Sequence, residues 1–174
     1  MIAKPFNLKK WIDENRDILK PPVGNKNLYK DAGDYIVMIV GGPNARKDYH
    51  YNETEELFYQ LEGDILVKIQ VDGESVDMPI KEGEMFLLPA KIPHSPIRPE
   101  GSVGLVIELK RKEEMNDGLL WFCSECNNKL HETYFHLNNI EQDFLPRFRE
   151  FYGSDEMRTC EKCGTKMQAD KRYV

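Results

Sequence analysis

Two histidines and a glutamate stand out in this 174-residue chain as candidate metal ligands. His50 lies eight residues after Gly42, Glu56 follows six residues later, and His94 lies eleven residues after Gly83. A single histidine is most often a packed core residue. Two histidines and a carboxylate at fixed distances from turn glycines instead indicate a metal site, because imidazole and carboxylate groups together suit a divalent transition metal.

The segments around these residues resemble the two signature motifs of the cupin superfamily, whose fold is an all-β double-stranded β-helix or jelly-roll barrel. The sequence departs from those motifs, because Asp48 stands where a histidine is common and Arg98 stands where an asparagine is common. Two imidazoles and one carboxylate remain. That set leaves positions open for oxygen and a substrate on non-haem iron, so we predict that His50, Glu56 and His94 bind catalytic Fe(II).

The residues alone leave two alternatives open for this ligand set. Glu55 has the usual spacing from His50, whereas Glu56 has the usual spacing from Gly63. We favour Glu56, because the strand that runs into Gly63 should fix which side chain faces inward. Asp48 could also be a ligand, and two histidines with two carboxylates would suit manganese.

Two arginines and a second glutamate could form the substrate side of the same pocket. Arg46 lies four residues before His50 and Arg98 lies four after His94, and even spacing on a strand puts side chains on one face. A buried arginine is costly unless it is paired. Arg98 could therefore grip a substrate carboxylate in bidentate fashion, while Glu108 accepts hydrogen bonds from an amine or hydroxyl. The alternative is that Arg98 and Glu108 form a structural ion pair or face solvent.

Four segments make the resemblance more specific, and it extends over nearly the whole chain. They look like the 3-hydroxyanthranilate 3,4-dioxygenase family and are KPPVGN (20–25), GGPNARKDYH (41–50), EELFYQLEG (55–63) and LLPAKIPHSPIRPE (87–100). The resemblance implies an extradiol-type ring-cleaving oxidoreductase that converts 3-hydroxyanthranilate and O2 to 2-amino-3-carboxymuconate 6-semialdehyde. That reaction lies on the route from tryptophan to quinolinate and NAD.

The resemblance also implies a role for each candidate site residue. The three ligands named above match the iron ligands of the family. Its substrate contacts match Arg98 and Glu108, and the residue beside its oxygen site matches Arg46, which would stabilise charge developing on oxygen. Glu56 would also contact the substrate and help to move a proton. A homodimer and a C-terminal metal knuckle are further expectations from the family.

Two C-x2-C pairs, separated by 33 residues, form the clearest motif outside the barrel. They are Cys123 with Cys126 and Cys160 with Cys163. Four thiolates with no fifth donor predict a closed, tetrahedral and structural Zn(II) site. A single iron, as in rubredoxin, is the open alternative. A thioredoxin-type redox pair is disfavoured because no βαβ pattern surrounds either motif.

The elements expected around these sites are mostly short strands. Apolar runs at 35–40, 57–63, 65–71, 75–80, 85–89 and 103–109, separated by glycine, proline and an Asp72-Gly73 hairpin turn, predict a sandwich or barrel. A helix capped by Asn7 should come first, and a short helix should begin at Pro146 and end at Gly153. We expect two units: a cupin barrel with its N-terminal helix over 1–112 and a rubredoxin-like knuckle over 113–174. His131 and His136 are expected on the surface without a function.

Composition limits the remaining classes of function. No stretch reaches the roughly 18–20 apolar residues of a membrane span, and no signal peptide is evident, so we expect a cytoplasmic protein without membrane contact. A net charge of −6 argues against nucleic acid as a partner. Another cupin enzyme, such as an isomerase or a thiol dioxygenase, and a non-catalytic binding module are the competing interpretations.

Overall fold

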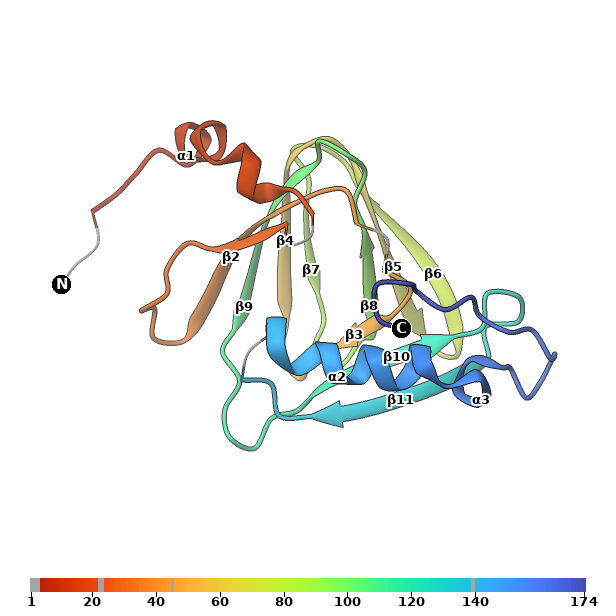
Figure 1. The fold of residues 1–174 in the computed structure, drawn as a ribbon. Coiled ribbons are helices and arrows are strands. Elements are labelled where there is room, and N and C mark those ends of the chain that lie inside the picture. Colours follow the sequence, from red (N-terminus) through yellow and green to blue (C-terminus); the bar gives the residue numbers. More distant parts are fainter. Residues whose placement is uncertain (1–3, 22–23, 45, 139) are drawn as a thin grey trace.

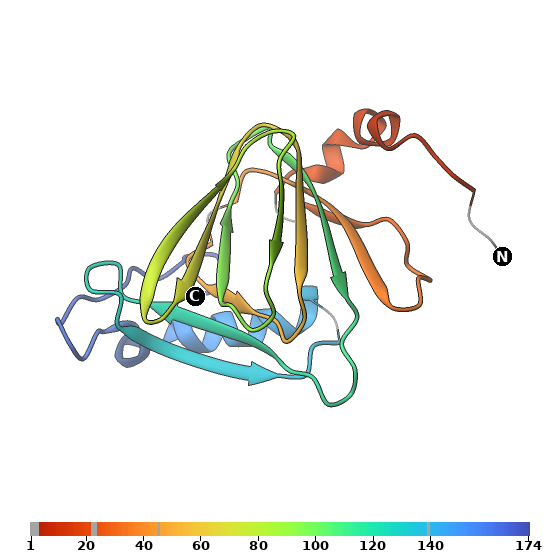
Figure 2. The same cartoon turned by 180° about the vertical axis from the view of Figure 1, so that it is seen from behind.

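The protein is built mainly of antiparallel strands in two sheets (Figures 1 and 2). The computed structural model describes residues 4–21, 24–44, 46–138 and 140–174. Across these residues the strand order is β1-β2-β9-β4-β7 in a five-stranded sheet and β11-β10-β3-β8-β5-β6 in a six-stranded sheet. The expected all-β-dominated fold is confirmed.

The predicted apolar runs form six of the strands, and five further strands in the described parts of the chain complete the two sheets. The five-stranded sheet contains β1 (Asn25–Asn27), β2 (Tyr35–Gly41), β4 (Glu56–Glu62), β7 (Met85–Leu88) and β9 (Val103–Leu109). The six-stranded sheet contains β3 (Tyr49–Tyr51), β5 (Ile65–Val71), β6 (Glu74–Ile80), β8 (His94–Ile97), β10 (Asp117–Phe122) and β11 (Lys129–Phe135).

The main core fills the space between the two sheets. Alternation along β4 and β5 turns every second side chain inward, and Phe58, Val67 and Val106 are almost fully buried there. The predicted hairpin turn is confirmed: Asp72 and Gly73 both have positive φ, and β5 pairs with β6 directly across them. The core therefore fixes the facing of each strand that carries a site residue.

The N-terminal helix α1 (Leu8–Glu14) and the 3-10 helix η1 (Arg16–Leu19) cover one end of the five-stranded sheet (Figure 1). The Asn7 side chain accepts a hydrogen bond from the Lys10 backbone N–H, so the predicted cap is confirmed. Ile12 and Leu19 bury against Ile39 of β2.

The C-terminal helix begins earlier than predicted. α2 runs over Ile140–Gly153, so its predicted end is confirmed, but Pro146 lies inside it and not at its first turn. An interior proline costs a hydrogen bond. Burial of Phe144, Phe148 and Phe151, which recur on one face of the helix against β10, offsets that cost. The short helix α3 (Asp155–Arg158) follows.

The tail joins the barrel through β10, which pairs with β3 on one side and β11 on the other. In both views α2 runs alongside β10 and β11 (Figures 1 and 2). The division into units 1–112 and 113–174 stays a prediction. His131 and His136 are half-buried, and His131 stacks on Phe151. No helix among the described residues is long and apolar enough to cross a membrane.

Candidate active site

The two histidines and the glutamate come together between the sheets. His50 of β3 and His94 of β8 are directly paired across neighbouring strands of the six-stranded sheet. Glu56 opens β4 of the opposite sheet. One ligand atom from each of the three side chains lies within 4.8 Å of the others, and all three residues are buried. The two sheets therefore supply a single cluster of two imidazoles and one carboxylate.

The hydrogen bonds around His94 prepare its inner nitrogen for a cation. Nδ1 lies 3.1 Å from the Ile92 carbonyl oxygen and donates its proton there, so Nε2 carries the lone pair. Nε2 lies 3.1 Å from Glu56 Oε2, which is buried and has no hydrogen-bond partner among the described residues. A lone pair on Nε2 and the carboxylate oxygen repel each other unless a proton or a metal ion lies between them. The cluster therefore fits a metal ion held by two imidazoles and one carboxylate.

The electrostatics of the cluster give the same result. Burial alone would raise the pKa of Glu56, yet the charges of His94 and His50 lower it to about 2. Burial likewise opposes the charged form of His94, but Glu56 raises the pKa of its imidazole. Glu56 is therefore held as a carboxylate, which is the form that binds a metal ion.

The structure also separates the alternative ligands. Glu55 is exposed, whereas Glu56 is buried in the cluster. Asp48 is buried but faces Arg46, whose Nε lies 3.1 Å and 3.2 Å from its two carboxylate oxygens. Asp48 thus neutralises an arginine, and it is not in the His50–Glu56–His94 group. The four-ligand manganese arrangement is not formed.

A cavity of about 110 Å³ opens beside the cluster and is lined by Arg46, Arg98 and Glu108. At about 10–15 Å³ for each water-sized group, it has room for about ten such groups. That space fits a small ligand the size of one substituted ring. The predicted inward direction of both arginines is confirmed by this lining.

Arg98 is the unusual group in the cavity, because it is 3% exposed and no described carboxylate forms an ion pair with it. Its Nη1 donates only a long, 3.5 Å hydrogen bond to Gln60 Oε1. Burial lowers the pKa of Arg98 to about 10, against the opposing effect of Glu56. A buried and unpaired guanidinium is costly. This group can recover the cost by binding an anion in the cavity.

Glu108 is not the partner of Arg98, so the predicted alternative of an ion pair between them is wrong. Its Oε2 instead accepts hydrogen bonds from Arg111 Nη1 at 2.7 Å and from Asn52 Nδ2 at 3.0 Å. Glu108 and Glu56 are paired on neighbouring strands β9 and β4. Burial, and then the charge of Glu56, raise the pKa of Glu108 to about 7. Glu108 can therefore accept or hold a proton near neutral pH.

Sequence reasoning missed four residues that shape this site. Phe144 of α2 lines the cavity, with its ring 5.4 Å from that of His50. Asp117 hydrogen bonds His50, Arg111 hydrogen bonds Glu108, and Gln60 contacts Arg98. Gln60 lies within the apolar run of β4, and the local signals for the other three were a polar segment after β9 and an aromatic tail. Neither signal indicated which strand of the barrel the tail would pair with.

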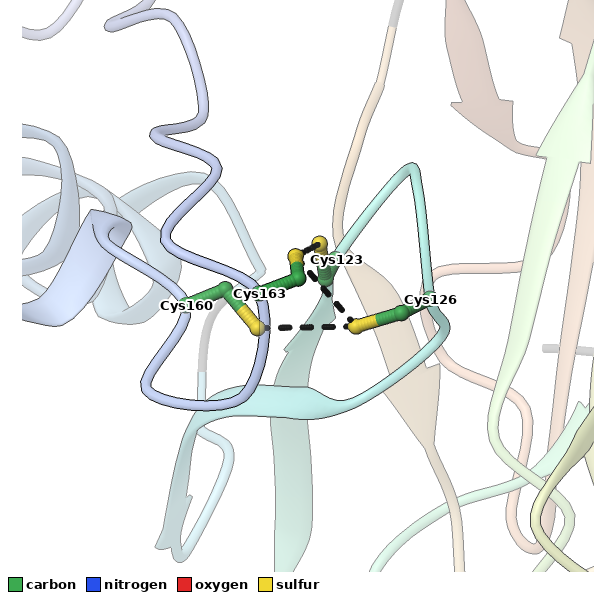
Figure 3. Close-up of side chains that lie close together, drawn as sticks. All are labelled: Cys123, Cys126, Cys160 and Cys163. Carbon is green, nitrogen blue, oxygen red and sulfur yellow. Dashed lines mark hydrogen bonds between the residues drawn. The ribbon is translucent and has the colours of Figure 1, made fainter.

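The four cysteines form a second and separate cluster (Figure 3). The sulfur–sulfur distances are 3.5 Å for Cys123–Cys163, 3.5 Å for Cys126–Cys163 and 3.6 Å for Cys126–Cys160. A tetrahedral ion with metal–sulfur bonds of about 2.3 Å would hold its sulfurs roughly 3.8 Å apart. The cysteines are not joined as disulfides. Their geometry therefore fits one metal ion with four thiolate ligands.

Each C-x2-C pair lies on a tight turn of the same design. The Asn127 N–H donates to the Cys123 carbonyl, and the Gly164 N–H donates to the Cys160 carbonyl. Asn127 and Gly164 both have positive φ, which glycine adopts freely and asparagine tolerates. Hydrogen bonds from Thr165 lower the pKa of Cys163 to about 6. This favours the thiolate, the form that binds metals.

Comparison with known proteins identifies the family. A sequence model of the 3-hydroxyanthranilic acid dioxygenase family matches residues 1–152. A protein of Xanthomonas campestris named 3-hydroxyanthranilate 3,4-dioxygenase is 54% identical over 174 residues, which cover 100% of this chain and 98% of that protein. One of the same name from a Jannaschia species is 54% identical over 160 residues, or 91% of this chain and 88% of that protein. A cupin-2 domain protein from Shewanella frigidimarina aligns with 18% identity and a TM-score of 0.47, over 57% of this chain and 92% of that chain. The chain belongs to the 3-hydroxyanthranilic acid dioxygenase family.

Proposed function

We propose that this protein is an iron(II)-dependent, extradiol-type dioxygenase that converts 3-hydroxyanthranilate and O2 to 2-amino-3-carboxymuconate 6-semialdehyde. The ring bond beside the hydroxyl-bearing carbon breaks, and both oxygen atoms enter the product. The single observation that carries the proposal is the buried guanidinium of Arg98, unpaired with any described carboxylate, in a one-ring cavity beside a cluster of two histidines and one carboxylate. The family and the names of the relatives support the same reaction on the tryptophan-to-quinolinate and NAD route.

Three residues of the cavity have different proposed roles in substrate binding. Arg98 binds the substrate carboxylate through two charge-assisted hydrogen bonds, which orients the ring toward the cluster. Glu108, already hydrogen bonded on one oxygen, accepts a proton or hydrogen bond from the ring amine or hydroxyl. Phe144 covers the cavity with an apolar ring and limits the access of water.

The chemistry of oxygen is assigned to the metal cluster and Arg46. His50, Glu56 and His94 would hold iron(II), which when bound would pass electrons from the substrate to O2. Arg46 lines the same cavity and keeps its charge through Asp48, so it stabilises negative charge that develops on the oxygen. Glu56, which is also a proposed metal ligand, is further proposed to help move a proton during the reaction.

The knuckle is proposed to hold a structural Zn(II). A four-sulfur site leaves no open position for a substrate, which suits a structural ion. Iron in the same site is the alternative, and metal analysis of purified protein with the iron centre stripped would distinguish the two. Reduced cysteines of this kind persist in the cytoplasm, which we propose as the location of the protein.

A homodimer is proposed on the outer face of the five-stranded sheet. Leu57, Leu87 and Ile107 are in register across β4, β7 and β9 on that face, and Leu87 is 53% exposed. An exposed apolar face of this kind marks an interaction site. Sedimentation should show a dimer that Leu87→Lys weakens, while Val76→Lys on β6 leaves it intact. An unchanged Leu87→Lys dimer would place the interface elsewhere.

Oxygen consumption tests the proposed reaction directly. Protein loaded anaerobically with Fe(II) should take up oxygen on addition of 3-hydroxyanthranilate but not of catechol or cysteine. Oxygen uptake on addition of cysteine would indicate a thiol dioxygenase. No uptake with any substrate, from protein verified to hold iron, would refute the proposal and favour an isomerase or a binding module.

A further inference from the structure

A buried network of ion pairs lies just behind the active site. Arg111, whose side chain is 3% exposed, follows β9 and contacts two carboxylates at once. Its Nη1 donates to Glu108 Oε2 at 2.7 Å, while Nε and Nη2 donate to Asp117 at 2.8 Å and 2.6 Å. Nη1 also donates to the Leu109 carbonyl. Every nitrogen of the guanidinium is therefore engaged, in the fork geometry that arginine favours.

Asp117 extends this network to the metal cluster. Its Oδ2 lies 2.5 Å from His50 Nε2 and also accepts the Arg111 bond. The hydrogen bond uses one ring nitrogen of His50 and leaves Nδ1 as the other. Carboxylates that hold a metal-binding imidazole in this way fix its orientation and make it a better ligand. Asp117 is fully buried, so its charge depends on these two partners.

The fold explains why this pair lies where it does. β10 pairs with β3 so that Leu119 is opposite His50, and Asp117, two residues earlier, begins the same strand. β9 ends just before Arg111 and carries Glu108 on its inward face. Arg111 thus spans the junction between the two sheets. An ion pair with a purely structural role would need neither a metal ligand nor a cavity residue as its partners.

We propose that Arg111 and Asp117 are positioning residues that hold the metal ligand His50 and the cavity residue Glu108 in one bonded unit. The inference rests on the proposed function for the role of Glu108, but not for that of His50. Loss of Asp117 loosens His50 and weakens metal binding. Loss of Arg111 does the same and also frees Glu108, so it weakens substrate binding as well.

The test measures Fe(II) affinity without substrate or oxygen, by competition with a chelator. Asp117→Asn, which keeps the shape, and Arg111→Met should each bind Fe(II) roughly 10–100-fold more weakly, the range typical for such partners of metal ligands. At saturating Fe(II), Arg111→Met should also raise KM for 3-hydroxyanthranilate about 10-fold, more than it lowers kcat. Arg158→Met is the control, because the Arg158 side chain is also buried, at 9% exposed, and also ion-paired, but its partner is Asp155 near the knuckle.

The Fe(II) affinities of these variants either support or refute the proposed positioning role. Wild-type Fe(II) affinity in Asp117→Asn, or an equal loss in Arg158→Met, would overturn it. If Arg111→Met does not fold, Arg111→Lys replaces it, since a single ammonium cannot span both carboxylates and the same losses are expected. Wild-type protein that binds Fe(II) but does not consume oxygen with 3-hydroxyanthranilate would refute the proposed function, while the affinity test of His50 positioning still stands.

Discussion

Adding one methyl group at Gly104 should displace Arg98, the proposed substrate-binding arginine, without touching the proposed metal ligands. Gly104 lies on β9 and faces the interior. A Cβ there would lie 2.9 Å from Arg98 Nη1 and 2.8 Å from Gln60 Oε1. Gln60 is anchored by a 2.9 Å hydrogen bond to the Glu62 carbonyl, whereas the Arg98–Gln60 bond is long. Both contacts are shorter than 3.0 Å, so both side-chain ends must shift, and the more weakly anchored Arg98 guanidinium should shift further.

The expected effects on binding and stability differ in size. Hydrogen bonds to a charged group contribute about 1.5–3 kcal/mol, so losing the carboxylate geometry should raise KM for 3-hydroxyanthranilate roughly 10- to 150-fold. Overpacking costs about 1–3 kcal/mol, and the low end applies because the end of a flexible side chain gives way. About 1 kcal/mol corresponds to a Tm loss of roughly 2–4 °C for a chain of this length.

The assay compares Gly104→Ala with Gly33→Ala, because a Cβ at Gly33 meets no atom within 4 Å. Oxygen uptake gives KM and kcat, thermal melting gives Tm, and metal analysis gives iron content. Gly104→Ala should bind iron normally and show the raised KM, whereas Gly33→Ala should behave as wild type. An unchanged KM in Gly104→Ala would refute the assignment of Arg98 as the carboxylate-binding residue.

Four further predictions follow from the same geometry. His94→Ala should abolish iron binding and activity while the knuckle metal stays, as metal analysis would show; normal turnover would contradict the ligand assignment. Arg98→Ala should keep iron and weaken substrate binding by about 2–5 kcal/mol, and an unchanged KM would refute its role. Cys160→Ser should release the knuckle metal and cost at least about 3 kcal/mol, or roughly 6–12 °C in Tm; an unchanged Tm would mean that the site does not stabilise the fold. Glu108 has a folded pKa of about 7 against 4.5 unfolded. In iron-free protein, the contribution of Glu108 to the free energy of unfolding is therefore full below about pH 4.5 and is lost as pH rises through about 7, a change of about 3 kcal/mol. The Tm of Glu108→Gln, measured at pH 5 and at pH 8, should not show this loss.

The parts of the fold that the sequence predicted are those with strong local signals. The strands β2, β4, β5, β6, β7 and β9 carry apolar runs bounded by turn residues, and all of them were expected. The strands β3 and β8 were missed although they carry His50 and His94. Each is short, and ligands and Pro96 replace the apolar residues that would have marked them. The site residues themselves caused this failure, because function there overrides the pattern on which prediction depends.

The network around Arg111 could not be predicted for a different reason. Its partners are set by which strand β10 joins, and that choice depends on long-range packing of the tail. Trp121 of β10 is fully buried, and its ring stacks 4.2 Å from that of Phe151 of α2. From the sequence, Arg111 and Asp117 lay in or beside a polar connector. Charged residues in such a segment usually face solvent, so their burial becomes evident only when both sheets are in place.

The position of the knuckle suggests why a structural metal accompanies this active site. Cys123 directly follows β10, and Cys160 lies just beyond α3, after α2. β10 carries Asp117, which hydrogen bonds His50, and α2 carries Phe144, which lines the cavity. One ion bound by both cysteine pairs would therefore tie together the two tail elements that contact His50, the proposed metal ligand. Because the tail buries its aromatics against one face of a sheet only, a metal ion at its end would help to hold Asp117 and Phe144 in place against the barrel.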